Sequence, residues 1–306
     1  MVVASNVEVT LWESMLGTEV RWVDASGVRT RILDAGTGSP LILLHGTGGH
    51  VETWARNVQA LSANNRVVAI DMIGHGLTDK AADLDYTPAD YADHVRNVMD
   101  ALGIQSAHFA GVSLGAWVAS WLALETPERV RSIINNTGAV FRWPEGEDPH
   151  EAAERRGMVK TSASLDELSM ESVRRRVHLL FHDKTKCPEE LVRLRYQLYS
   201  TPQAQAVTAK LHHMLPYDSP DRVAFSLTPE RLGKLSMPVL YLWGEFNPGG
   251  SVENGRRAAS MTPNGEFVMI RGVGHWPQFE GPAEFNSLAS DFLHRVESAT
   301  SGTTNE

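Results

Sequence analysis

The chain has 306 residues, of which 42% are hydrophobic, so it can bury a sizeable core as one large domain or as one domain with an insertion. Its formal net charge of -9 argues against a nucleic-acid-binding surface and against attraction to anionic membranes. The expected partner is a small molecule, and the sequence leaves a homo-oligomer open. Cys187 is the only cysteine, which excludes an internal disulfide, and residues 1–14 lack the pattern of a signal peptide. These features predict a cytoplasmic protein.

The first predicted element is a hairpin. Residues 18–36 alternate in polarity around a Ser-Gly turn, which is typical of two antiparallel strands at the edge of a sheet. After it, short apolar runs rich in β-branched residues alternate with segments of helical spacing. This alternation predicts an α/β fold with a mostly parallel, doubly wound sheet covered on both faces. The predicted strands are 41–46, 66–72, 106–113, 129–136, 238–244 and 266–272, and the predicted helices are 51–61, 88–102, 114–125 and 282–296.

The rhythm changes from about Trp143 to Leu227, where no strand signal appears and prolines separate several short helical patterns. This stretch predicts an inserted helical cap. The Arg-rich stretches 154–156 and 174–176 are balanced by Glu and Asp, which favours solvated helix faces. The predicted organisation is a core in two parts, 1–142 and 228–298, a cap at 143–227 and a flexible tail at 299–306.

Two glycine-rich segments follow predicted strands. The segment GVSLG, residues 111–115, matches G-x-S-x-G, the turn that projects a nucleophilic serine, here Ser113, from the edge of a sheet. The segment HGTGG, residues 45–49, can aim a backbone N–H at a developing oxyanion. The N–H groups of Thr47 and Leu114 are therefore the candidate oxyanion donors. The alternative for HGTGG is a turn that needs glycines only for its backbone conformation.

His275 lies in a loop directly after the last predicted strand. Ends of parallel strands gather the chemistry of such folds, and a base follows the serine in chain order in this architecture. His275 is therefore the candidate general base. No spacing of ligands suggests a metal site, and no cofactor is predicted.

These motifs resemble the α/β-hydrolase superfamily from about residue 18 to residue 297. More narrowly, the chain resembles the meta-cleavage-product hydrolases, which split a carbon–carbon bond in dienoate ring-fission products. The marks are GHWPQFE, AEFNSL and the cap segment FHDKTKCPEELVRLRYQLYSTP. The resemblance implies that Arg195 binds the carboxylate end of the substrate and that Trp276 contacts it. Polar recognition near Gly46 and Val112 has changed, because HGTGG replaces a HGGGPG-like loop and Val112 stands where these hydrolases usually carry Asn.

Arg195 also stands out by spacing alone. In a helix that begins at Pro188, the apolar stripe consists of Leu191, Leu194 and Leu198, and Arg195 falls inside it. An arginine on an inward face needs an anionic partner, which is either the substrate or a carboxylate of the protein.

Asn247 occupies the position where the resembling hydrolases carry the Asp that orients the histidine. An amide can accept a hydrogen bond from His275 but brings no charge. Three readings follow. Glu245 reaches His275 instead, or the site works as Ser-His-Asn on a reactive substrate, or the protein has lost hydrolysis and only binds.

The sequence therefore predicts a serine-type hydrolase of a small anionic substrate, with carbon–carbon cleavage of a 2-hydroxy-6-oxo-dienoate-type ring-fission product favoured. One alternative is a carboxylesterase or lactonase that uses the same site. Another is a non-hydrolytic small-molecule receptor or a cofactor-free oxygenase on the same fold. Epoxide hydrolysis and dehalogenation by the usual covalent route are disfavoured, because they need Asp at position 113.

Overall fold

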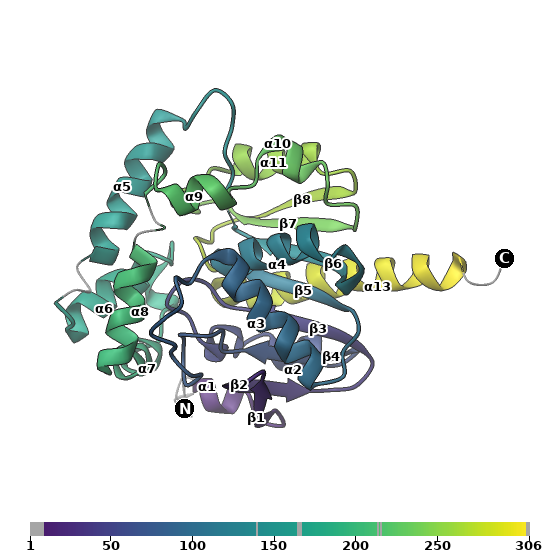
Figure 1. The fold of residues 1–306 in the computed structure, drawn as a ribbon, viewed down its shortest axis with the longest axis horizontal. Coiled ribbons are helices and arrows are strands. Elements are labelled where there is room, and N and C mark those ends of the chain that lie inside the picture. The colour runs from purple at the N-terminus through teal and green to yellow at the C-terminus, as the bar shows by residue number, and fades with distance from the viewer. Residues whose placement is uncertain (1–8, 139, 164–166, 213, 215, 304–306) are drawn as a thin grey trace, which may run out of the picture.

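An eight-stranded sheet forms the centre of the computed structural model, which describes residues 9–138, 140–163, 167–212, 214 and 216–303 (Figure 1). The strand order is β1-β2-β4-β3-β5-β6-β7-β8. The pairs β1–β2 and β2–β4 are antiparallel and the other pairs are parallel, which confirms the predicted mostly parallel sheet. The strands are β1 Glu19–Ala25, β2 Val28–Ala35, β3 Ser39–Leu44, β4 Asn65–Ile70, β5 Ala107–Val112, β6 Val130–Asn136, β7 Val239–Gly244 and β8 Gly265–Ile270.

The predicted edge hairpin is confirmed as β1 and β2. Its two-residue turn consists of Ser26 and Gly27, with φ angles of 57° and 87°, and Ala25 pairs with Val28 across the turn. Positive φ at both central residues gives a turn whose twist matches that of the flanking strands.

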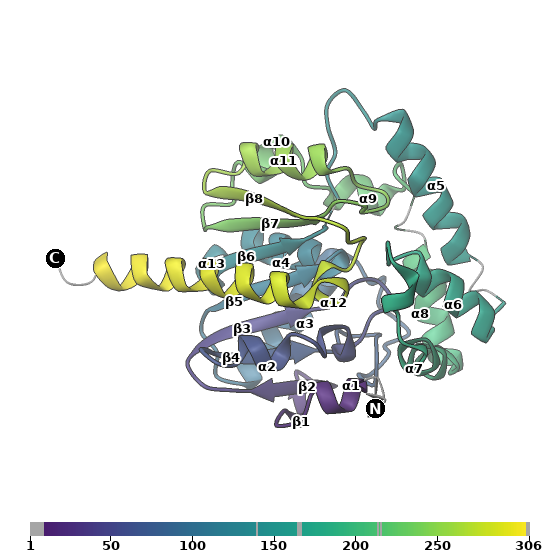
Figure 2. The same cartoon turned by 180° about the vertical axis from the view of Figure 1, so that it is seen from behind.

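Helices cover both faces of the sheet. One face packs against α3 (Pro88–Ala101), α4 (Leu114–Glu125) and α11 (Val252–Met261), which lie toward the viewer in Figure 1. Figure 2 shows α2 (Val58–Leu61), α12 (Pro277–Glu280) and α13 (Pro282–Thr303) on the opposite face. The remaining short helices of the core are α1 (Leu11–Ser14) and α10 (Pro229–Leu232).

The prediction of one helix over residues 51–61 is wrong. The chain forms a 3₁₀ turn, η1 (Val51–Trp54), and then α2. The Asn57 side chain between them donates hydrogen bonds of 2.8 Å to the carbonyl oxygen of Gln278 and to Oδ1 of Asn286. These tertiary bonds hold Asn57 at φ -123°, ψ -35°, so the helical path is interrupted.

Helices α5 to α8 lie together beside one edge of the α/β core, at the left of Figure 1 and at the right of Figure 2. The described residues between 143 and 227 form no strand. The exact limits of the cap stay a prediction, although an isolated bridge between Phe141 and Leu227 brings its two predicted ends together. The helices are α5 Pro149–Ala163, α6 Met170–His178, α7 Glu189–Tyr199, α8 Pro202–His212 and α9 Pro220–Phe225, with a 3₁₀ turn, η4, at Lys184–Lys186.

Helix α13 continues to Thr303 and extends beyond the body of the molecule in Figures 1 and 2, and the flexibility of the tail at 299–306 stays a prediction. Residues 304–306 lie outside the described residues. In the described part of the chain, no helix combines the length and the apolar character needed to cross a lipid bilayer.

Candidate active site

Ser113 occupies a sharp turn between β5 and α4, with φ 54° and ψ -112°. A side chain in this left-handed region is strained, so the surroundings must hold it in place. A Cβ on Gly111 would lie 2.3 Å from the carbonyl carbon of Gly115, and a Cβ on Gly115 would lie 2.3 Å from the carbonyl oxygen of Leu44. Glycine is therefore required at both positions, and the predicted strand–turn–helix is confirmed.

Ser113 borders a pocket at the carboxyl ends of the parallel strands, between the core and helices α5, α6, α8 and α9. Thr47, Leu114 and His275, which come from three separate loops or turns of the chain, line the same pocket. It encloses about 710 Å³ of space not filled by protein atoms, part of it open to solvent. The fold thus brings together the predicted nucleophile, base and oxyanion donors.

His275 is held by Asn247. Nδ1 of His275 lies 2.6 Å from Oδ1 of Asn247, and Nδ2 of Asn247 donates a hydrogen bond of 2.8 Å to the carbonyl oxygen of Gly250. Because the amide nitrogen is engaged by a carbonyl, its oxygen accepts the Nδ1 proton of His275 and leaves Nε2 without a proton. Burial, together with the positive charge of Arg176, lowers the pKa of His275 to about 3. The ring is therefore a neutral base at neutral pH.

Glu245 does not take this role. Its side chain is exposed, and its carboxylate accepts the backbone N–H of Gly272 at 2.9 Å. The reading in which Glu245 reaches His275 does not match this arrangement, whereas direct contact between Asn247 and His275 does.

The loop of His275 is also tied to the cap segment after α6. The backbone N–H of His275 donates to the carbonyl oxygen of Leu180 at 2.8 Å. The buried carboxylate of Glu280 accepts the N–H of Gly274 at 2.7 Å and the N–H of Asp183 at 2.6 Å. The position of the base is thus fixed relative to the cap as well as to the sheet.

Arg195 faces inward as predicted. It is 1% exposed, whereas Arg193 on the other side of α7 is exposed. The guanidinium carbon lies 4.9 Å from the ring centre of Trp276, and Nε, Nη1 and Nη2 have no hydrogen-bond partner among the described residues. Neither Arg195 nor Trp276 belongs to the described lining of the pocket. Their contact with substrate stays a prediction.

The two remaining predicted binding positions lie close to Ser113 in the chain or in space. A Cβ on Gly46 would lie 3.2 Å from the Cβ of Ser113, so this glycine keeps the approach to the serine open. The Val112 side chain is fully buried in the core. The Val112 side chain is therefore part of the core next to Ser113. A direct contact of Gly46 or Val112 with substrate stays a prediction.

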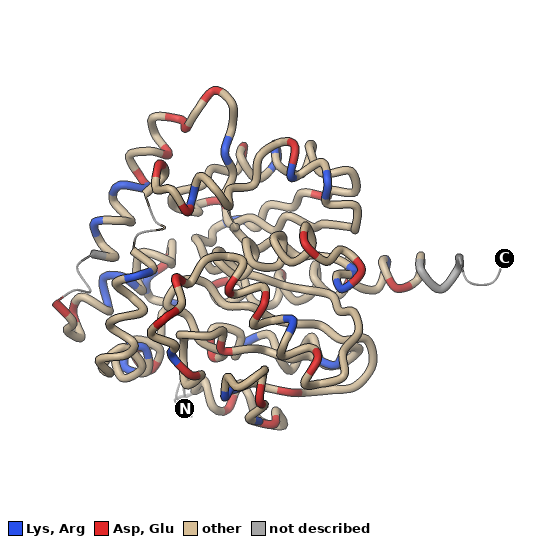
Figure 3. Tube along the Cα trace, in the orientation of Figure 1, with Lys and Arg blue, Asp and Glu red and all other residues tan. Residues whose placement is uncertain are grey.

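Three arginines that were not predicted as site residues line the pocket: Arg155, Arg176 and Arg222. No Asp or Glu belongs to its described lining. The interpretation of 154–156 and 174–176 as solvated faces is therefore wrong for Arg155 and Arg176. Figure 3 shows Lys and Arg positions along α5 and α6. Among them, the side chains of Arg155 and Arg176 line the pocket.

The inward direction could have been found from helical spacing. Arg176 stands at i+3 from Val173 and next to Val177, and both valines are fully buried. Arg155 shares a stripe at i, i+3, i+4 and i+7 with three other pocket residues, Met158, Val159 and Ser162. A count of positive against negative residues along the sequence does not reveal this pattern, because such a count takes no account of the side of the helix on which each side chain lies.

Arg176 is poised for an anion. It is 8% exposed, and its Nη1 is buried without a hydrogen-bond partner among the described residues. Burial lowers the pKa of Arg176 to about 10, and the positive charge of Arg195 adds to this effect. The group still carries its charge at neutral pH, so a bound anion would satisfy a buried cation that otherwise costs free energy.

The described residues contain no group of three or more His, Cys, Asp or Glu side chains that could hold a metal ion.

Comparison with known proteins places this geometry in a family. Residues 39–282 match the alpha/beta hydrolase fold family. The 2-hydroxymuconate semialdehyde hydrolase of Pseudomonas sp. (strain CF600) is 30% identical over 91% of this chain and 95% of its own. The enzyme of the same name from Pseudomonas putida is 31% identical over 89% of this chain and 93% of its own. A mutant of the meta-cleavage product hydrolase CumD from Pseudomonas fluorescens IP01, complexed with acetates, superposes with a TM-score of 0.76 at 27% identity, covering 90% of this chain and 98% of that one. The chain is a hydrolase that belongs to the α/β-hydrolase family and groups with the meta-cleavage-product hydrolases.

Proposed function

We propose that the protein hydrolyses a carbon–carbon bond in a small anionic ring-fission product of the 2-hydroxy-6-oxo-dienoate type. The observation that carries the proposal is the grouping of Ser113, His275 and Arg176 around one pocket. This grouping supplies a nucleophile, a neutral base and a buried cation for a carboxylate. The names of the relatives, 2-hydroxymuconate semialdehyde hydrolases, support the same class of substrate.

Cleavage starts from the keto tautomer, in which the proton of the 2-hydroxyl group has moved to C5. His275 Nε2 accepts the hydroxyl proton of Ser113 while Oγ forms a bond to the carbonyl carbon C6. The N–H groups of Thr47 and Leu114 stabilise the resulting oxyanion. Donors of this kind are worth roughly a hundredfold to a thousandfold each in rate.

Collapse of this intermediate breaks the bond between C5 and C6. The electron pair moves through the conjugated chain to the oxygen at C2, which takes up the proton from His275. Water then hydrolyses the acyl-serine, with His275 first accepting a proton from the water and then returning it to Ser113. We place the carboxylate and the C2 oxygen near Arg176 and Arg195, where positive charge stabilises the electrons that leave C5.

The amide of Asn247 fits this chemistry better than it fits ester hydrolysis. The leaving group is a conjugated dienolate whose charge is spread over several atoms and is placed next to an arginine. Such a substrate needs less stabilisation of the His275 imidazolium than an ordinary amide or ester does.

The test adds the purified protein to a coloured ring-fission product and, in parallel, to a nitrophenyl ester. The expected result is fast bleaching of the first and slow release of nitrophenol from the second, with both lost in Ser113→Ala. Fast ester hydrolysis without bleaching would assign the protein to the esterases, and no turnover of either compound would contradict hydrolysis at this site.

A further inference from the structure

The loop that carries the proposed oxyanion donor Thr47 is a tight turn next to Ser113. The N–H of Gly49 donates to the carbonyl oxygen of Gly46 at 2.8 Å. Gly48, the third residue of the turn, has φ 65°, a conformation that glycine adopts without strain. A Cβ on Gly46 would lie 3.2 Å from the Cβ of Ser113, so the turn lies directly beside the serine. A change in the shape of this turn would therefore move the N–H of Thr47 relative to Ser113.

The hydrogen bonds of this turn all run in one direction. The carbonyl of one residue and the N–H of the next belong to the same planar peptide unit. The unit between Gly48 and Gly49 donates its N–H to the carbonyl oxygen of Gly46, and the unit that contains this carbonyl ends in the N–H of Thr47. Consecutive hydrogen bonds polarise one another, by about 10–30% per bond. A donor to the carbonyl oxygen of Gly48 therefore both strengthens and orients the N–H of Thr47.

Tyr199 is such a donor. Its hydroxyl group donates to the carbonyl oxygen of Gly48 at 2.8 Å, and a Cβ on Gly48 would overlap the hydroxyl oxygen. Tyr199 is the last residue of α7, a helix of the predicted cap, whereas the turn belongs to the core. Arg195, the proposed partner of the substrate carboxylate, lies one helical turn earlier on the same helix. One cap helix thus carries the proposed carboxylate-binding arginine and also binds the oxyanion loop.

The turn is fixed from two sides. On the core side, Nδ1 of His45 donates to the carbonyl oxygen of Gly46 at 2.8 Å, and its Nε2 accepts the N–H of Met72 at 3.0 Å. On the cap side, Gly48 and Tyr199 line a second cavity, which contains about 300 Å³ of space not filled by protein atoms, part of it open to solvent. This space leaves room for the peptide unit after Gly48 to shift when the hydroxyl group of Tyr199 is absent.

We propose that Tyr199 is a positioning residue for the oxyanion donor Thr47, so that a helix of the cap completes the oxyanion hole. The inference rests on the proposed function, in which the N–H groups of Thr47 and Leu114 stabilise the oxyanion. Removal of a whole oxyanion donor costs roughly a hundredfold to a thousandfold in kcat. His45 still supports the turn when the hydroxyl group of Tyr199 is lost, so we expect a smaller loss of about tenfold.

The test measures kcat and KM of Tyr199→Phe for a coloured ring-fission product and for a neutral nitrophenyl ester. Both reactions pass through an oxyanion, so kcat should fall about tenfold for both compounds, while KM changes by less than about twofold. The ester has no carboxylate for an arginine to bind. A loss of activity confined to the ring-fission product would therefore assign Tyr199 to substrate binding and would overturn the inference.

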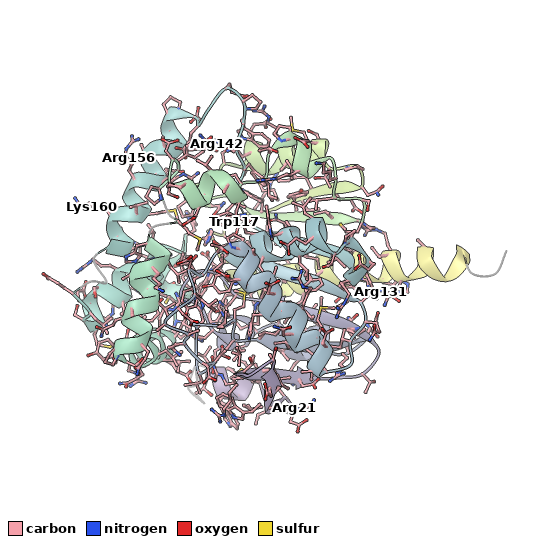
Figure 4. All side chains as sticks on the ribbon, in the orientation of Figure 1. Arg21, Trp117, Arg131, Arg142, Arg156 and Lys160 are labelled. Atoms are coloured by element: carbon pink, nitrogen blue, oxygen red, sulfur yellow. The ribbon has the colours of Figure 1, made fainter. Side chains whose placement is uncertain are left out.

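Two control variants separate this role from a general disturbance of the cap. Tyr196→Phe makes the same chemical change on the same helix, and both tyrosines are half-buried against the same apolar cluster. Arg156→Gln changes the cap on its outer side, because Arg156 is exposed on α5 (Figure 4). Both controls should keep kcat, and a tenfold loss in either one would contradict a specific role of Tyr199.

A trifluoromethyl ketone with a short alkyl chain gives a readout that does not need turnover. Oγ of Ser113 forms a bond to its carbonyl carbon, the hydroxyl proton passes to His275, and the electron pair of the carbonyl bond becomes an oxyanion that faces the N–H groups of Thr47 and Leu114. Tyr199→Phe should weaken inhibition by this ketone about tenfold. Unchanged kcat or unchanged inhibition in the folded variant would overturn the role of Tyr199.

The same ketone distinguishes failure of this inference from failure of the proposed function. If the unmodified protein cleaves neither compound, carbon–carbon cleavage is contradicted, and the inhibition by the ketone still decides the role of Tyr199. If the ketone does not bind to the unmodified protein, the oxyanion site itself is contradicted, and the inference falls with it.

Discussion

Replacing Asn247 by Asp tests how much a carboxylate next to Nδ1 of His275 would add to the rate. The Asn247 amide is 6% exposed and contacts Nδ1 of His275 at 2.6 Å, so an Asp carboxylate would meet the ring at the same place. In the serine-protease case, the corresponding Asp is worth about 10⁴ in kcat, or roughly 5.5 kcal/mol. This factor is the upper limit for the gain in kcat that we expect from Asn247→Asp.

The new carboxylate would also lose a contact. Nδ2 of Asn247 donates to the carbonyl oxygen of Gly250, and the Asp oxygen in its place would face that carbonyl without a hydrogen. An unsatisfied buried polar group costs about 1–3 kcal/mol. This cost lowers the stability of the variant and not kcat, because it is present in the ground state and the transition state alike. We expect a gain of roughly tenfold to a thousandfold in kcat, below the upper limit because the surrounding site is fitted to an amide.

The assay is the pH profile of kcat/KM for a ring-fission product. The pKa of His275 lies at about 3, because the ring is buried near Arg176 without an opposing charge. A neighbouring carboxylate favours the protonated ring, so Asn247→Asp should raise this pKa and move the acid limb of the profile to higher pH. Glu245→Gln is the control and should change little, since Glu245 is exposed and accepts the N–H of Gly272 on the side away from the Asn247–His275 contact. A severe loss in Glu245→Gln beside an unimproved Asn247→Asp with an unshifted acid limb would refute the reasoning.

Three further perturbations test the nucleophile, the turn and the buried histidines. Ser113→Ala should lower turnover by more than about a thousandfold while ligand binding persists, and activity within tenfold of the unmodified protein would remove Ser113 as nucleophile. Gly115→Ala should destabilise the fold by about 2–3 kcal/mol, because its Cβ would meet the backbone oxygen of Leu44 at 2.3 Å, and an unchanged urea midpoint would contradict this. Burial lowers the pKa of both His45 and His94 to about 3, so between about pH 6.5 and 3 the unfolded chain binds protons that the folded chain cannot. The free energy of unfolding should then fall by about 1.4 kcal/mol per pH unit for each histidine as pH drops below 6.5, and equal stability at pH 6.5 and pH 5 would be the contrary result.

The elements that local patterns specify could be predicted from the sequence. The edge hairpin follows from its Ser26-Gly27 turn and its alternating polarity, and the serine turn follows from Gly111 and Gly115, which backbone contacts require. Both features carry a local sequence motif, although the requirement for Gly115 also depends on its contact with Leu44. The break before α2 could not be predicted, because Asn57 is held by partners more than 200 positions away.

The charge of the pocket shows a different limit of sequence reasoning. In the stretch 174–176, Arg174 forms ion pairs with Glu171 and Glu189, as expected of a solvated face, whereas Arg176 turns into the pocket. Counting opposite charges treats the three arginines alike. The arginines differ because the buried Val173 fixes which side of α6 faces inward, and Arg176 lies on that side. Whether a pocket exists on that side depends on how the helix packs.

The contacts around His275 explain how the core and the cap act as one site. The core supplies Ser113 and the proposed oxyanion donors. In the segment that follows α6, Leu180 accepts the backbone N–H of His275, and Glu280 of α12 accepts N–H groups from both this segment and the histidine loop. Arg176 lies on α6, so the same segment connects a buried cation of the pocket to the base. A shift of this segment would therefore move Arg176, the proposed carboxylate-binding group, together with His275. For carbon–carbon cleavage this link is an advantage, because the electron pair leaving C5 must reach the oxygen at C2 while the base stays within reach of Ser113.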